Sequence, residues 1–169
     1  MTSRKPLFVY GSMLDQDVLE VVLGRRLAAD ARLTARLAGY VCVRLPDETY
    51  PILAPRPGGL VPGAVLSELR SDDWKRVEFF ESTEYEFARC RVELDSGERI
   101  DAVYCAEHNV APGAAESWEF AWWRERHKPE YIVMIRQYMA LYGNAGLEEA
   151  EALWERLSGR SQPGRKLGG

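Results

Sequence analysis

The stretch from Leu7 to Met13 constrains the fold more than any other part of the chain. Four apolar or aromatic residues, Leu-Phe-Val-Tyr, run directly into Gly11 and Ser12, with Pro6 ahead of them. A short apolar run between Pro and Gly predicts a buried β-strand that ends in a tight turn. Gly11 lacks a Cβ, so its backbone can take a positive φ and let a ligand approach closely. Successive N–H groups at such a turn form an anion-binding site, although the pattern also fits an ordinary strand-to-helix turn.

A helix and several strands are predicted after this turn. Asp15 and Asp17 precede an apolar run that Gly24 closes, and this punctuation is typical of a helix. Strand-like sequence follows, and Gly39 divides its first part into a predicted pair of strands. The strand-forming segments lie at residues 31–45, 50–53 and 60–69.

The middle of the chain predicts one more helix and a β-hairpin. Ser71 and the two aspartates after it favour a helix start, because a serine side chain caps the first N–H groups and acidic residues suit that end. Residues 87–94 and 98–106 flank an Asp-Ser-Gly turn, which is the pattern of a hairpin.

The last third of the chain is different in character and predicts helices. Apolar residues recur at helical spacing in residues 131–142 and 146–157, after an aromatic cluster at residues 118–123. Strands with a few helices, followed by a helical tail, indicate an α+β fold. Because no long linker divides the chain, we expect one domain over residues 1–159, with 114–159 as a helical extension and 160–169 as a disordered tail.

The composition excludes several classes of function. A hydrophobic fraction of 46% and a formal net charge of −4 fit a globular protein without general attraction to nucleic acid or membrane surfaces. Three widely spaced cysteines, an odd number, argue against a disulfide framework or a structural zinc site, and buried apolar thiols are expected. The apolar run near the N-terminus is too short for a signal peptide or a membrane span, so a cytoplasmic location is expected.

Glu81 is a more suggestive candidate for acid–base chemistry than the histidines. The chain has no phosphate-binding glycine loop and no Gly-x-Ser-x-Gly elbow, and nothing favours a catalytic triad on Ser12. The two histidines, His108 and His127, fit surface positions. Glu81 follows two phenylalanines, and a carboxylate that aromatic groups shield from water has a raised pKa and can serve as general base and acid. A solvated glutamate in an acidic neighbourhood is the alternative.

These residues resemble the γ-glutamylcyclotransferase-like superfamily, and in particular the branch of the plant avirulence-induced gene product and its bacterial relatives. The resemblance extends in order from Leu7 to about Tyr142. The matching pieces are Tyr10-Gly11-Ser12-Met13, the run from Asp17 to Arg25, Gly39-Tyr40, Tyr50-Pro51-Ile52, Val61-x-Gly63, Glu78-Phe79-Phe80-Glu81, Ala102-Val103-Tyr104 and Trp118-Glu119-Phe120.

The resemblance implies a small mixed β-barrel with flanking helices and an enzyme that cyclises a γ-glutamyl group to 5-oxoproline. Glu81 would be the catalytic acid and base. The loop Tyr10, Gly11, Ser12 and Met13 would bind the glutamyl end through backbone N–H groups, and Tyr50 and Tyr104 would line the pocket. The substrate's own amine is the nucleophile in this chemistry, so no metal and no cofactor are expected.

Some alternatives remain open at this stage. The family usually has glycine after the catalytic glutamate, where this chain has Ser82, and either Tyr85 or Phe87 can take the position of the family's next tyrosine. The alternatives to a cyclotransferase are a silent small-molecule binding module and an amide hydrolase that uses the same pocket. The aromatic cluster can serve as core or as a ligand platform, and the helical extension can cap the barrel or form a homodimer contact.

Overall fold

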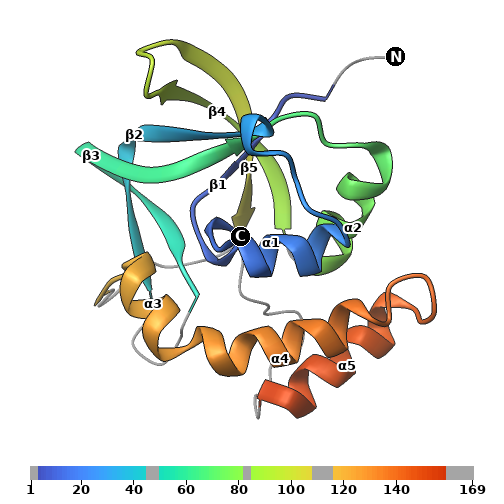
Figure 1. The fold of residues 1–169 in the computed structure, drawn as a ribbon. Coiled ribbons are helices and arrows are strands. Elements are labelled where there is room, and N and C mark those ends of the chain that lie inside the picture. The colour runs from blue at the N-terminus through green and yellow to red at the C-terminus, as the bar shows by residue number, and fades with distance from the viewer. Residues whose placement is uncertain (1–3, 45–49, 82–84, 108–115, 159–169) are drawn as a thin grey trace.

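A closed five-stranded barrel is the centre of the structure. The computed structural model describes residues 4–44, 50–81, 85–107 and 116–158. β1 pairs with β3 antiparallel and with β5 parallel, while β2 pairs with both β3 and β4 and thereby closes the barrel. The mixed barrel with its helices confirms the predicted α+β fold (Figure 1). The barrel strands are β1 (Leu7–Val9), β2 (Arg32–Arg44), β3 (Ile52–Leu66), β4 (Tyr85–Leu94) and β5 (Arg99–Glu107).

The strand pair predicted around Gly39 is wrong, because β2 is a single strand with a bulge. The register against β3 shifts between Ala38 and Tyr40, and Gly39 takes a φ of 87°. β3 is likewise one strand where the sequence predicted two segments. Gly59 lies so close to β2 that a Cβ there would sit 2.4 Å from the carbonyl oxygen of Tyr40. The glycines therefore bend a long two-stranded ribbon and do not end its strands.

The predicted hairpin is confirmed as β4 and β5. Val92 lies opposite Ile100, and the turn between the strands places Gly97 at a φ of 86°. A residue with a Cβ is strained at such a φ, so the Asp-Ser-Gly sequence suits this turn.

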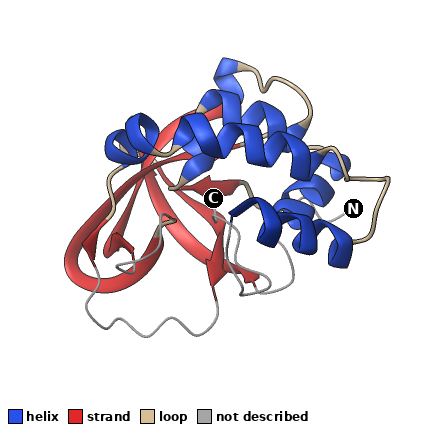
Figure 2. Cartoon of the chain, turned by 90° about the horizontal axis from the view of Figure 1, so that it is seen from below, coloured by secondary structure: helices blue, strands red, loops and turns tan. Residues whose placement is uncertain are grey.

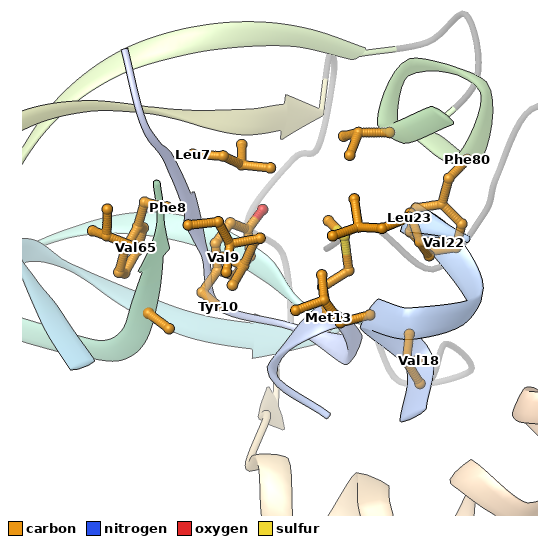
Figure 3. Packing of buried hydrophobic residues seen from close by; sticks show 14 of the residues in the cluster. Leu7, Phe8, Val9, Tyr10, Met13, Val18, Val22, Leu23, Val65 and Phe80 are labelled. Carbon is orange, nitrogen blue, oxygen red and sulfur yellow. The ribbon is translucent and has the colours of Figure 1, made fainter. Parts of the chain in front are cut away.

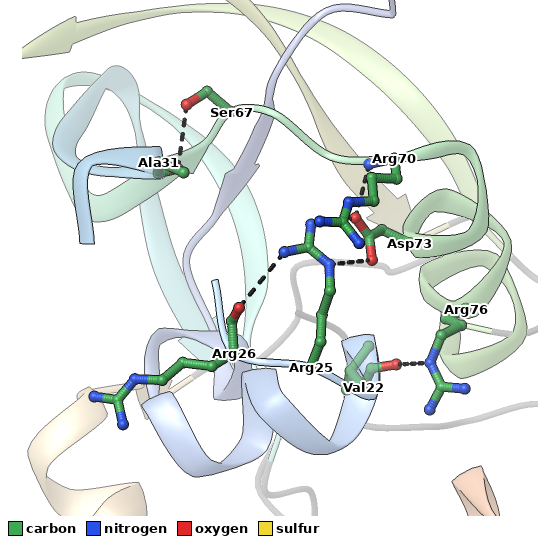
Figure 4. Close-up of polar contacts among 8 residues, drawn as sticks. All are labelled: Val22, Arg25, Arg26, Ala31, Ser67, Arg70, Asp73 and Arg76. Atoms are coloured by element: carbon green, nitrogen blue, oxygen red, sulfur yellow. Dashed lines mark hydrogen bonds and ion pairs between the residues drawn. The ribbon is translucent and has the colours of Figure 1, made fainter. Parts of the chain in front are cut away.

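Two helices flank one side of β1. α1 (Gln16–Leu23) begins at Asp15, whose side chain accepts hydrogen bonds from the N–H groups of Asp17 and Val18, and ends at Gly24 with a φ of 70°. This is the helix that the sequence predicts. α2 (Ser71–Glu81) packs beside it, and Arg76 donates a 2.8 Å hydrogen bond to the carbonyl of Val22 in α1 (Figure 4).

The core between barrel and helices is built around β1. Leu7, Phe8 and Val9 are all buried, and Phe8 lies beside Val65 of β3. Figure 3 shows Met13 directed toward α1, where the apolar face of that helix receives it. The opening strand is therefore central to packing, as its apolar sequence indicates.

In the described part of the tail, a short strand pairs with β2, and three helices lie on one side of the barrel (Figure 2). Lys128 attaches α4 to α1, because its Nζ lies 2.8 Å from a carboxylate oxygen of Asp15 and 2.6 Å from one of Asp17. α5 packs on α4, where Trp154 contacts two tyrosine rings edge-on. The tail elements are β6 (Glu116–Ser117), α3 (Phe120–Arg126), α4 (Lys128–Met139) and α5 (Leu147–Ser158).

These elements confirm the helices predicted near the C-terminus, whereas β6 was not predicted. Trp118 and Trp123 of the aromatic cluster are buried, which favours core packing over a ligand platform. The proposed disordered tail, residues 160–169, lies outside the described residues. None of the helices in the described part of the chain has the length and apolarity to cross a membrane.

Candidate functional site

Glu81 is buried at the C-terminal end of α2. Its exposed fraction is only 6%, and the preceding Phe80 is fully buried, so the alternative of a solvated glutamate does not fit the structure. Burial raises the pKa of Tyr131 and of Tyr138, and the negative charge of Glu81 raises both further. The carboxyl group therefore lies within electrostatic range of two phenolic hydroxyls from α4.

Tyr138 fixes the end of α2 that carries Glu81. Its hydroxyl donates a 2.7 Å hydrogen bond to the carbonyl oxygen of Phe79, and the two rings lie 5.0 Å apart. The last carbonyl groups of a helix have no partner within the helix, so a hydroxyl from a neighbouring helix satisfies one of them. The tail helices thus contribute directly to the position of the candidate acid and base.

The Tyr10 to Met13 loop runs into a 3₁₀ turn, η1 (Ser12–Leu14). Gly11 has a φ of −120°, so the positive φ considered for it is wrong. The turn itself provides the tight geometry, because the N–H of Leu14 donates to the carbonyl of Gly11 at 3.0 Å. The first N–H groups of such a turn have no partner within it, and these are the groups that can receive an anion.

Ser12 connects the loop to the same helix that approaches Glu81. Its Oγ lies 3.3 Å from the hydroxyl of Tyr131, and both side chains are buried. Unlike Ser12, Met13 packs its side chain in the hydrophobic core. Only the backbone of Met13 is therefore available for the binding role that the resemblance implies.

Tyr10 and Tyr104 lie together on the barrel side of the loop. Their rings are 6.3 Å apart and nearly perpendicular, and the hydroxyl of Tyr10 donates to the carbonyl of Cys105 at 2.9 Å. Tyr40 stands on the other side of Tyr104 at 6.4 Å. Burial raises the pKa of Tyr104, and the neighbouring Tyr40 raises it further. Tyr50, the remaining predicted site residue, is buried with 1% of its surface exposed.

The structure therefore divides the predicted residues into two groups on either side of one loop. Ser12 lies with Glu81 and the helices, while Tyr10 lies with Tyr104 and the barrel. Sequence reasoning missed Tyr131 and Tyr138, whose spacing of seven residues places both on one face of α4. The sequence does contain a signal for them, because two tyrosines share one face of a segment that was predicted only as a packing helix.

Two of the three cysteines, Cys42 and Cys90, do not supply a ready nucleophile. Burial raises the pKa of the Cys42 thiol to about 12, and burial together with Asp101 raises that of Cys90 to about 11. Both thiols are therefore protonated at neutral pH, in agreement with the expected apolar role. No group of three or more metal-ligating side chains occurs among the described residues. That the protein needs no metal or cofactor stays a prediction.

The structure has a closed mixed β-barrel, a loop after its first strand and a buried glutamate at a helix end. These are the features that the resemblance implies for a γ-glutamylcyclotransferase-like protein. The sequence profile of the family described as gamma-glutamyl cyclotransferase, AIG2-like, matches residues 7–125. The chain belongs to this family, as the resemblance predicts.

Relatives that the chain resembles come from Arabidopsis thaliana. AIG2-like protein C is 30% identical over 147 residues, which cover 86% of this chain and 82% of that protein. AIG2-like protein A is 30% identical over 135 residues, 79% of this chain and 80% of that protein. The solution structure of a protein from the same plant has 26% identity and a TM-score of 0.60, and covers 89% of this chain and 94% of that one. The family and the fold are therefore confirmed together.

The hydrogen bond from Tyr138 gives a first testable prediction. We expect Tyr138→Phe to lower the free energy of unfolding by about 1–2 kcal/mol, because the Phe79 carbonyl loses its donor while the ring packing is kept. Chemical denaturation measures this change. Tyr142→Phe is the matched control, since the Tyr142 hydroxyl bonds the exposed Asp72, and it should cost less than about 0.5 kcal/mol. Equal losses in the two variants would contradict a specific role for Tyr138.

Proposed function

We propose that the protein is a γ-glutamyl cyclotransferase-like enzyme that converts a γ-glutamyl amine or amino acid to 5-oxoproline and releases the amine. The observation that carries the proposal is the burial of Glu81 at the end of α2, within electrostatic range of Tyr131 and Tyr138, in a chain of this family. A buried carboxyl group at a helix end suits proton transfer.

The reaction needs only positioning and proton transfer. The α-amine of the substrate attacks its own γ-carbonyl carbon, a new C–N bond closes the five-membered lactam, and the bond to the leaving amine breaks. The attacking ammonium loses two protons, one before the attack and one as the lactam forms. Glu81 takes each in turn and delivers it to the leaving nitrogen, which departs as an ammonium, so atoms and charges balance. Holding amine and carbonyl in a ring-closing pose supplies the entropic part of the acceleration.

The loop after β1 would hold the glutamyl end. Backbone N–H groups of Gly11, Ser12 and Met13 open the 3₁₀ turn, and donors of this kind can bind the α-carboxylate or the oxyanion that develops at the carbonyl. The bond between Ser12 and Tyr131 supports a rigid loop beside the proton-transfer group. Tyr10, Tyr50 and Tyr104 would complete the walls of the pocket.

Two other functions use the same pocket. In an amide hydrolase, Glu81 would activate water and the product would be glutamate. In a silent binding module, the ligand would bind without turnover. The cyclotransferase is favoured because the substrate carries its own nucleophile, and the pocket then needs only the groups described.

The test is incubation of the protein with a panel of γ-glutamyl amines and amino acids, followed by mass spectrometry of the products. We expect 5-oxoproline and the free amine in equal amounts. Glutamate in place of 5-oxoproline would support the hydrolase. Binding by calorimetry without any product would support the binding module.

A further inference from the structure

A groove lies between the bent β2–β3 ribbon, the η1 turn and the start of α3. Its volume is about 500 Å³. Apolar side chains form most of its lining: Leu60 and Pro62 come from β3, Leu14 from η1, and Phe120 from α3. Leu60 is 57% exposed, an unusual state for a leucine on a strand of this barrel. Figure 1 shows α3 next to the end of β2 and the start of β3.

The groove begins at the loop that would bind the glutamyl end. Tyr10 and Leu14, the residues on either side of the Gly11–Met13 segment, both line it. A substrate whose glutamyl end lies on the loop would therefore extend its other end along the apolar wall. About 500 Å³ is enough for one amino-acid side chain with its backbone groups.

Arg32 gives the groove a positive charge. Its guanidinium is held by the side chain of Gln16 at 3.2 Å and by the carbonyl oxygen of Leu14. No carboxylate of the described residues forms an ion pair with Arg32, and a guanidinium carries five N–H donors, more than these two contacts use. Glu119, the other charged lining residue, is solvent-exposed, so water screens its charge.

We propose that this groove holds the leaving group of the substrate and selects an apolar amino acid, with its side chain on Leu60 and Phe120 and its carboxylate at Arg32. The inference rests on the proposed function and adds the substrate class to it. An apolar wall favours a large apolar side chain, at about 25 cal/mol for each Å² removed from water. The guanidinium distinguishes an amino acid from the corresponding amine, because only the amino acid presents a carboxylate.

The test compares three compounds that share the glutamyl end: γ-glutamyl-phenylalanine, γ-glutamyl-phenethylamine, which lacks the carboxylate, and γ-glutamyl-glycine, which lacks the side chain. For the wild type we expect kcat/KM to be highest for the phenylalanine compound, by about tenfold or more over each of the others. Equal turnover of all three would overturn the inference while leaving the proposed function intact. No 5-oxoproline from any of them, at any concentration, would instead count against the function itself.

Arg32→Gln tests the charge separately from the fold. We expect it to lower kcat/KM for the phenylalanine compound about tenfold and to leave the phenethylamine compound unchanged. A purely structural effect on the η1 turn would lower both values by the same factor and would overturn the role of Arg32. Arg36→Gln is the control, because Arg36 lies on the same strand but pairs with Glu93; it should leave the ratio of the two values unchanged.

Leu60→Asp tests the apolar wall. The substitution places a carboxylate on an exposed strand position, so the fold should persist while KM for the phenylalanine compound rises about tenfold. Leu33→Asp, at a 38% exposed leucine of β2 away from the groove, is the matched control and should change nothing. Identical effects of the two substitutions would contradict the assignment of the groove.

Discussion

Glu81→Gln is expected to reduce the rate of 5-oxoproline formation by about 100- to 10,000-fold, the usual contribution of general acid–base catalysis. Glutamine has nearly the same shape, so the end of α2 and its contacts with α4 should be retained. Only the ability to exchange a proton is lost. Product formation followed by mass spectrometry under saturating substrate measures the effect on kcat.

Glu78→Gln is the matched control for this experiment. Glu78 lies three residues earlier on α2, is 38% exposed and forms an ion pair with Arg4 at the surface. Its substitution should leave kcat within about twofold, because an exposed ion pair contributes little. Thermal unfolding of both variants checks that each is folded. Full activity of Glu81→Gln, in a folded protein, would remove Glu81 from the mechanism whatever the substrate.

The largest effect on stability is expected for Asp73→Asn, about 2–4 kcal/mol in the free energy of unfolding. Asp73 is 3% exposed and accepts two hydrogen bonds from Arg25, at 3.0 and 2.6 Å, which join the segment directly after α1 to α2 (Figure 4). The backbone N–H of Arg70 donates a third bond at 2.7 Å. Asparagine removes the charge and one acceptor, and leaves Arg25, itself only 25% exposed, without its partner.

Urea denaturation of Asp73→Asn and of the wild type at neutral pH measures this loss. Asp72→Asn is the neighbouring control, because Asp72 is exposed and receives one hydrogen bond from Tyr142. It should cost less than about 1 kcal/mol. A smaller loss for Asp73→Asn than for Asp72→Asn would show that the Arg25 pair does not hold the helices together.

The same pair predicts how stability depends on pH. Burial opposes ionisation of Asp73, but the hydrogen bonds from Arg25 and Arg70 outweigh it and hold the pKa below its ordinary value. A carboxyl group whose pKa is lower in the folded state stabilises the fold above its unfolded pKa of about 3.9. That contribution disappears as the pH falls through the lower, folded value. The stability difference between wild type and Asp73→Asn should therefore be constant from pH 7 to about pH 5 and shrink in stronger acid.

Features that depend on local residues could be predicted from the sequence. Asp15 and Gly24 mark the two ends of α1 because capping and a left-handed C-terminus need those residue types. The β4–β5 hairpin follows in the same way from alternating apolar residues around Gly97. The resemblance supplied the family, which no local pattern could have given.

Features that depend on distant contacts could not be predicted. Gly39 signals a break in a strand, but whether the chain turns or bulges there depends on β3, which approaches closely at Gly59. The surroundings of Glu81 likewise depend on α4, where Tyr138 bonds the carbonyl oxygen of Phe79 and lies more than fifty residues further along the chain. The periodicity of a helix predicts which of its faces is apolar, but it does not predict which distant carboxyl group will lie near that helix.

The most direct test of the proposed chemistry is the reaction in water labelled with heavy oxygen. When the substrate's own amine attacks the γ-carbonyl, no oxygen from water enters the product. We therefore expect 5-oxoproline of ordinary mass from the wild type, because all of its atoms come from the glutamyl group of the substrate. Glutamate that carries the heavy isotope in its γ-carboxylate would contradict this result, because it would show that water, and not the amine, is the nucleophile.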